Sequence, residues 1–237
     1  MLDALARGIG HLLSGSADIA EIVFLSLRVS GTAVLLGLLI GLPIGVAVGV
    51  GRFPARRLAV AAIHTGFALP PVVVGLFIYL VLSRSGPLGH LGLLFTPTAM
   101  IIAQAVLAAP YVAGITLAAV QAVPDGVRFQ ARALGATPLQ ALLAHLREAR
   151  LGIGAAVVAG FGAVISEVGA VMLVGGNVQG ETRVMTTAIV LETRRGDLAA
   201  AVALGIVLLV IAFAVNIALT RLQQGPDDLA RVGRRAA

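Results

Sequence analysis

Five long apolar stretches constrain this chain more than any other feature of its sequence. A helix needs about 20 apolar residues to cross the hydrocarbon core of a membrane. Five segments reach that length: residues 22–50, 58–82, 96–120, 153–175 and 198–220. Only 12% of the residues are charged and 59% are hydrophobic, which leaves too few charges to cover a water-soluble domain of this size. We therefore predict an all-α integral membrane protein with five transmembrane helices.

Polar residues divide the chain around these spans. We predict an external amphipathic segment at residues 1–21, a transmembrane domain at 22–220, and an Arg-rich tail at 221–237. Within the domain, residues 121–150 are too polar to cross a membrane and form an insert between the third and fourth spans. This insert is the longest polar interruption of the domain.

The arginines predict the orientation. Residues 51–57, 121–150 and 221–237 share one side of the membrane and hold eleven of the 17 basic residues, and the other side holds six. Because arginine accumulates in cytoplasmic loops, we expect the insert and the carboxy terminus in the cytoplasm and the amino terminus outside. The net charge of +6 then reflects the membrane face and its lipids, and we expect no nucleic acid partner.

Missing residue types exclude several functions. All 17 basic residues are arginines, so the chain lacks the lysine that a phosphate-binding P-loop or a Schiff base requires. It has no cysteine, and its four histidines, at positions 11, 64, 90 and 145, show no metal-ligand spacing. We expect no catalytic residue, metal site or cofactor in this chain. If ATP drives its activity, another chain binds the ATP.

The insert reads as two short helices joined by a sharp turn. Gly135 is a typical residue at the end of a first helix, and Thr137-Pro138 combines an N-cap with a first-turn proline for a second helix. Such a pair would project from the membrane and could dock a partner. The alternative is an ordinary interfacial loop.

Glycines recur every four residues in the first span. Gly37, Gly41, Gly45 and Gly49 would form a groove along one helix face, where a neighbouring helix can approach closely. We interpret this stripe as helix packing.

A few residues inside the spans could line a pathway or a gate. Pro70-Pro71 interrupts the second span, as a hinge or as a static kink. Glu167 needs a partner or water at membrane depth, so we expect a hydrogen-bonding role or a place near the gate. The remaining candidates carry hydroxyl or amide groups that could hydrogen-bond an oxyanion or simply join helices. They are Thr65, Asn177, Thr186 and Thr187.

The insert also resembles a known motif. Residues 130–140 are similar to the EAA loop of binding-protein-dependent ABC importer permeases, with Ala131 and Gly135 at matching positions. The family glutamate is replaced by Phe129. By this resemblance, the ATPase-coupling residues are Gln130, Ala131, Arg132, Gly135 and Thr137.

Four further stretches are similar to the tungstate-type permeases, which are related to the molybdate ones. These stretches are residues 67–79, 83–89, 165–177 and 186–193. The resemblance implies a type I importer permease of MetI-like architecture in the bacterial inner membrane. It also implies a homodimer of permeases, two ATP-binding subunits and an extracytoplasmic substrate-binding protein. The expected function is ATP-driven import of a tetrahedral oxyanion by alternating access, and the oxyanion that the resemblance implies is tungstate.

Three alternatives stay open at this point. Molybdate or sulfate could replace tungstate as the cargo. The chain could be a secondary anion transporter that works without ATP, although internal repeats and intramembrane ion pairs are not evident. It could also be a membrane enzyme, although Glu167 has no His, Asp or Glu clustered around it in the sequence.

Overall fold

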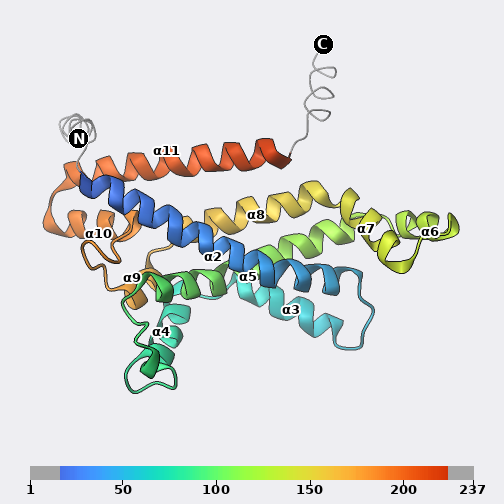
Figure 1. The fold of residues 1–237 in the computed structure, drawn as a ribbon, viewed down its shortest axis with the longest axis horizontal. Coiled ribbons are helices and arrows are strands. Elements are labelled where there is room, and N and C mark those ends of the chain that lie inside the picture. Colours follow the sequence, from blue (N-terminus) through green and yellow to red (C-terminus); the bar gives the residue numbers. More distant parts are fainter. Residues whose placement is uncertain (1–16, 224–237) are drawn as a thin grey trace, which may run out of the picture. The chain divides into compact units, whose positions relative to one another are not determined.

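A computed structural model describes residues 17–223 of the chain (Figure 1). Within that range the structure is helical and contains no β-strand. The elements are α2 (Ala17–Val50), α3 (Arg56–Phe67), α4 (Pro71–Leu82), the 3₁₀ turn η1 (Gly89–Leu91), α5 (Pro97–Ala122), α6 (Gly126–Ala133), α7 (Pro138–Glu148), α8 (Arg150–Ile165), α9 (Gly169–Gly175), α10 (Met185–Arg195) and α11 (Leu198–Gln223).

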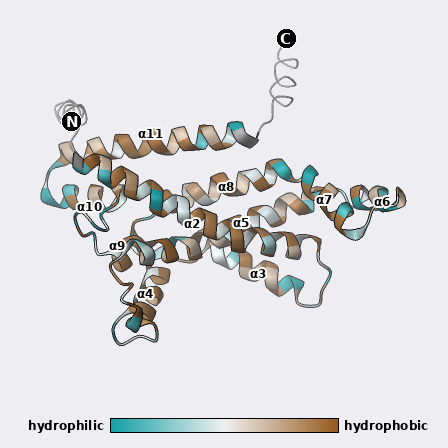
Figure 2. Cartoon of the chain, in the orientation of Figure 1, coloured by the Kyte–Doolittle hydropathy of each residue, from teal (hydrophilic) through white to brown (hydrophobic). Residues whose placement is uncertain are grey.

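Three of these helices are long and apolar enough to cross a membrane by themselves: α2 over Asp18–Val50, α5, and α11 over Leu198–Arg221. Two pairs of shorter helices, α3 with α4 and α7 with α8, meet the same test only together, and counting each pair as one span gives five. The predicted number of five is the upper end of this range of three to five, and it is reached only if α7, part of the predicted insert, is counted with α8. Figure 2 shows the apolar residues along the long helices and the polar ones at helix ends and in turns.

Two of the predicted spans are interrupted. In the second, α3 ends at Phe67 and α4 begins at Pro71, so the break falls at Pro70-Pro71 as predicted. In the fourth, α8 ends at Ile165 and α9 begins only at Gly169. Residues 153–175 are therefore not one continuous helix. The polar pair Ser166-Glu167 lies at this second break.

The predicted terminal segments fall largely outside the described residues. Residues 1–16 of the external segment and 224–237 of the tail belong to the part that the structure does not describe. Residues 17–21 form the first turn of α2, so this helix begins before the predicted span does.

Residue contacts divide the chain into two compact units. Of the described residues, the first unit comprises 17–36, 69–108 and 161–214, and its core contains Val29, Val74, Met100, Ala103 and Val171. The second unit comprises 37–68, 109–160 and 215–223 of the described residues, and its core contains Val48, Ile63, Ala113 and Leu117.

Glycines allow the helices of the second unit to approach closely. A Cβ atom added at Gly41 would lie 2.5 Å from the carbonyl oxygen of Ala109, and one at Gly45 would lie 2.5 Å from that of Ala113. One at Gly49 would lie 2.8 Å from Cγ1 of Val120. The predicted glycine groove is thus confirmed at these three positions, and its occupant is α5. Gly152 makes a similar approach between α8 and α5.

Candidate functional site

The insert forms a helical hairpin in the second unit, which we call the coupling knob (residues 126–148) after the role expected for it from the sequence. It consists of α6 and α7, which pack against each other (Figure 1). Gly135 ends the first helix with φ +87°, a left-handed conformation that glycine adopts without steric cost. The amide of Ala136 donates to the carbonyl of Ala131 (3.0 Å), and that of Gly135 donates to Arg132 (3.0 Å). These two bonds form a Schellman motif, so the predicted helix end at Gly135 is confirmed.

The second helix of the knob begins with a capping box. The Thr137 hydroxyl accepts the amide of Gln140 (3.3 Å), and the Gln140 side chain accepts the amide of Thr137 (2.8 Å). Pro138 occupies the first helical position, where its missing amide costs no hydrogen bond. The predicted N-cap is therefore confirmed, and the four residues between α6 and α7 have two opposed caps.

Large apolar side chains are exposed around this turn. Leu134 is 89% exposed, Phe129 71% and Leu139 65%. Gln130 and Arg132 are also exposed, whereas Ala131 is half-buried. Clustered exposed apolar residues rimmed by polar ones are typical of a protein interaction surface. Phe129, at the position of the family glutamate, contributes to this surface.

Charged groups tie the base of the knob to the preceding loop. The Asp125 carboxylate accepts a hydrogen bond from Nη2 of Arg128 at 2.7 Å and lies 3.5 Å from Nη2 of Arg52. The hydrogen bond from Arg128 holds the pKa of Asp125 below its usual range, against the smaller opposing effect of desolvation. Asp125 is therefore ionised at neutral pH.

A buried histidine fixes α7 to α5. The His145 ring is 2% exposed, and its Nε2 lies 3.0 Å from the carbonyl oxygen of Val120. Because a carbonyl only accepts, Nε2 carries the proton of this bond. Nδ1 of His145 is buried and has no hydrogen-bond partner among residues 17–223.

In the first unit, Glu167 organises the break between α8 and α9. Its carboxylate oxygen Oε1 accepts the amide of Ala170 (3.0 Å) in the first turn of α9, and its carbonyl accepts the hydroxyl of Thr186 (2.9 Å). The buried Gln104 of α5 donates to the carbonyl of Val164 (2.9 Å), just before the break. The polar groups exposed by the interruption are thus paired with side chains from two other helices.

Helix α10 begins on a second set of hydroxyl contacts. Thr187 is fully buried, and its hydroxyl accepts the amide of Val184 (3.1 Å) and donates to the Val184 carbonyl (3.0 Å). Ser26 of α2 accepts the amide of Met185 (2.8 Å). The hydroxyls of Thr186 and Thr187 therefore donate to protein carbonyls in this structure.

The loop before α10 carries strained and unpaired polar groups. Asn177 has φ +54°, which is uncommon for a residue with a side chain, and its Oδ1 is buried without a partner among the described residues. Nε of Arg183 is likewise buried and unpaired within residues 17–223. Thr182 closes the loop, because its hydroxyl donates to Gly175 (2.5 Å) and accepts from Val178 (2.9 Å).

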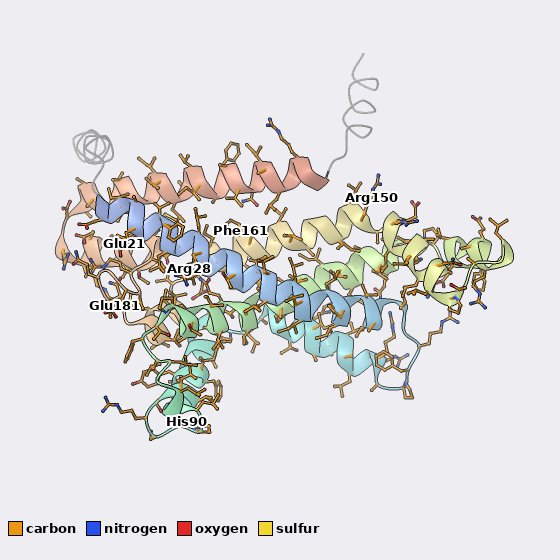
Figure 3. All side chains as sticks on the ribbon, viewed as in Figure 1. Glu21, Arg28, His90, Arg150, Phe161 and Glu181 are labelled. Atoms are coloured by element: carbon orange, nitrogen blue, oxygen red, sulfur yellow. The ribbon has the colours of Figure 1, made fainter. Side chains whose placement is uncertain are left out.

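A cavity of about 290 Å³ opens beside this loop, and Arg183 lines it. Glu21 of α2 and Glu181 of the loop lie at the same end of the first unit (Figure 3). The charged residues of its lining are Asp18, Glu21, Glu181, Arg183, Glu192 and Arg195. Carboxylates outnumber arginines there, so this cavity does not favour an anion.

The two interrupted spans meet in the first unit, where α4 and α9 pack together. Pro70 is the N-cap of α4 and Pro71 its first residue. A Cβ atom at Gly75 would lie 2.6 Å from Cα of Ala170, and one at Gly169 would lie 2.5 Å from Cγ2 of Val72. The contact is thus made near the amino-terminal ends of both helices.

The predicted candidates separate into three groups. The residues predicted to couple to an ATPase share the knob, and Thr65 lies elsewhere in the second unit. The remaining candidates lie in the first unit; they are Pro70, Pro71, Glu167, Asn177, Thr186 and Thr187. Thr65 is exposed, and its hydroxyl donates to Ala61 of its own helix (2.9 Å). We did not predict the roles of Ser26, Gln104 and Thr182. The signal that could have indicated the first two is a polar side chain inside an apolar span.

A family comparison decides the class of this protein. The family model described as the binding-protein-dependent transport system inner membrane component matches residues 41–227. The chain belongs to this family. It is therefore an inner membrane permease subunit of a binding-protein-dependent ABC importer, and the predicted family is confirmed.

Two relatives extend the match over most of this permease. A probable anion ABC transporter permease of Haloferax volcanii is 46% identical over 203 residues, which cover 84% of this chain and 88% of the relative. The tungstate uptake permease TupB of Peptoclostridium acidaminophilum is 41% identical over 213 residues, which cover 90% and 93%.

The fold of this permease also matches a solved structure. A chain of the MetNI methionine ABC transporter, in an inward-facing conformation, superposes with a TM-score of 0.69 at 20% identity, covering 87% of this chain and 94% of that chain. The predicted MetI-like architecture is confirmed.

Proposed function

We propose that this permease carries tungstate into the cell by alternating access, as a homodimer with two ATP-binding subunits and an extracytoplasmic binding protein. The observation that carries the substrate is the identity with a tungstate uptake permease along nearly the whole chain. The anion permease relative agrees in the class of cargo.

The division of labour follows from residues on the chain. Without a lysine, the permease cannot supply a P-loop, so ATP hydrolysis belongs to the partner subunit. The coupling knob is the surface proposed to receive that subunit, through Phe129, Leu134 and Leu139. Its rigid turn would transmit a displacement rather than absorb it.

Two copies are proposed because five helices are few to enclose a gated path. The paired helices α4 and α9, which follow the breaks at Pro70-Pro71 and at Glu167, are the proposed moving elements of the gate. Rocking of helix bundles around such breaks would alternate access between the two sides. In the orientation predicted from the arginine distribution, the knob faces the cytoplasm and the amino terminus faces outward.

Reconstitution tests this proposal. The permease would be co-expressed with its candidate ATP-binding subunit, purified, and placed in proteoliposomes with the partner binding protein. We expect two permeases per complex and ATP-dependent accumulation of tungstate, with molybdate and sulfate competing weakly. Stronger competition by molybdate or sulfate would reassign the cargo, and failure to co-purify with any ATP-binding subunit would contradict the proposed assembly.

A further inference from the structure

A second cavity lies at the base of the coupling knob. Its volume is about 430 Å³, and it is lined by the carboxyl end of α2, the loop after it, the end of α5, and the start of the knob. All of these segments belong to the second unit. Because α2 and α5 are membrane-spanning candidates, their ends place the cavity near the boundary of the membrane.

The charged lining of this cavity is mainly cationic. Arg52, Arg56 and Arg128 face a single carboxylate, that of Asp125. The carboxyl ends of α2 and α5 each contribute about half a negative charge. The lining therefore keeps a net positive charge of about one when His145 is neutral.

The guanidinium groups are only partly used by the protein. Nε of Arg56 donates to the carbonyl of Val48 (3.0 Å), but its terminal nitrogens Nη1 and Nη2 have no partner among residues 17–223. Arg52 makes the longer contact with Asp125, at 3.5 Å, and its side chain is 82% exposed. A planar guanidinium with free terminal donors matches the oxygens of a tetrahedral anion.

We propose that this basal cavity binds a tetrahedral oxyanion group, bridging Arg56 to Arg52 and Arg128. In the structure, the Asp125 carboxylate takes the place of the anion at two of these arginines, since it accepts a hydrogen bond from Arg128 and lies near Arg52. It is thus an internal competitor for the anion. The group comes either from an anionic lipid headgroup, at whose level the helix ends lie, or from free phosphate in the aqueous phase.

Matched variants of the full permease in neutral detergent test the site. Arg56→Gln and Arg128→Gln each remove a lining cation, Arg57→Gln removes a neighbouring exposed arginine outside the lining, and Asp125→Asn removes the competitor. Titration calorimetry with inorganic phosphate measures the free-ion source. Native mass spectrometry after passage through nanodiscs of phosphatidylcholine, alone or with equal phosphatidylglycerol, measures the lipid source.

We expect Arg56→Gln and Arg128→Gln each to weaken anion binding about tenfold in one of the two arms of the test, calorimetry with phosphate or mass spectrometry with lipid. Arg57→Gln should leave it within about twofold, because the change in total charge is the same but no direct contact is lost. Asp125→Asn should tighten anion binding. No gain in affinity is expected if Asp125 serves only to join Arg128 and Arg52. The arm that responds identifies the source of the anion.

Thermal melting of each variant checks that the fold is retained, and Asp125→Asn keeps the test decisive if Arg56→Gln unfolds the loop. Equal behaviour of all three arginine variants in both arms would overturn the proposal. So would weaker association with the ATP-binding subunit while both anion arms stay unchanged, because the cavity would then accept an acidic side chain of that subunit. The basal cavity would bind its anion whichever cargo the permease carries.

Discussion

At the scale of single residues, Gly135 is constrained by its backbone alone. An added Cβ atom would meet no atom within 4 Å, yet its φ of +87° disfavours any residue with a side chain. The conformation is needed because the Ala136 amide must reach the Ala131 carbonyl. Any cost of substitution therefore reports on the turn and on nothing packed against it.

We expect Gly135→Ala to destabilise the turn by about 1 kcal/mol and to lower hydrogen-exchange protection of the Ala136 amide about fivefold. Gly126→Ala is the control, since Gly126 is also open to solvent but lies at the helical start of α6. In the assembled importer, Gly135→Ala should reduce transport per ATP hydrolysed. Equal protection of the Ala136 amide in both variants would argue against a conformational role of Gly135.

Residues with local roles could be predicted from the sequence, and those with distant partners could not. The hydrogen bonds that depend on Gly135 and Thr137 join residues no more than five positions apart. The types of these two residues were therefore enough to predict the turn. Glu167 was predicted to hydrogen-bond, and its carboxylate accepts the amide of Ala170 three positions on. The distant hydroxyl of Thr186, which donates to the Glu167 carbonyl, could not be named. The positive φ of Asn177 was not predicted; this residue lies in a loop that Thr182 closes through hydrogen bonds to Gly175 and Val178, which are several positions away.

At the scale of helices, glycine spacing distinguishes packed from open faces within α2. Gly45 touches the α5 backbone, whereas a Cβ atom at Gly31 would meet nothing within 4 Å. Both glycines lie within the same membrane-spanning candidate, so they share its helical context. The difference between them isolates the close approach to α5.

We expect Gly45→Ala to lower unfolding stability by about 1–3 kcal/mol, because the added methyl group must push α5 away. Gly31→Ala should be neutral or slightly stabilising, since alanine favours a helix over glycine. Denaturation in detergent, followed by circular dichroism, measures both. A loss in Gly31→Ala as large as in Gly45→Ala would mean that α2 depends on glycine for another reason.

The helices were predicted more completely than their interruptions. Apolar length located α2, α5 and α11, and Pro70-Pro71 indicated the break before α4. The break before α9 carries no proline. Because the residues on both sides of it are apolar, the span predicted at residues 153–175 ran across the break. Two hydrogen bonds stabilise the break, one from the Ala170 amide to the Glu167 carboxylate and one from the Thr186 hydroxyl to the Glu167 carbonyl. The length of an apolar segment does not predict such contacts.

At the scale of the whole molecule, the proposed role of the knob requires that the knob lie on the cytoplasmic side, where ATP is available. The arginine distribution predicts the knob in the cytoplasm and the loop between α4 and α5 outside. The chain has no cysteine, so any introduced thiol is unique. Labelling of single thiols can therefore map the two faces directly.

We expect Gln140→Cys, on α7 of the knob, to react with a membrane-impermeant maleimide only in inside-out vesicles. Ser85→Cys, in the loop after α4, should react only in right-side-out vesicles or intact spheroplasts. Both positions are exposed, so the comparison tests sidedness rather than burial. The reverse pattern would invert the proposed topology and separate the knob from cytoplasmic ATP.

The two opposed caps of the knob also bear on how the chain is made. Their hydrogen bonds join residues no more than five positions apart, from Ala131 to Ala136 and from Thr137 to Gln140. Contacts of such low sequence separation form quickly and need no distant partner. During synthesis, the hairpin can therefore fold as soon as it leaves the ribosome, before α8 is inserted, and present a formed surface to its proposed ATP-binding partner early in assembly.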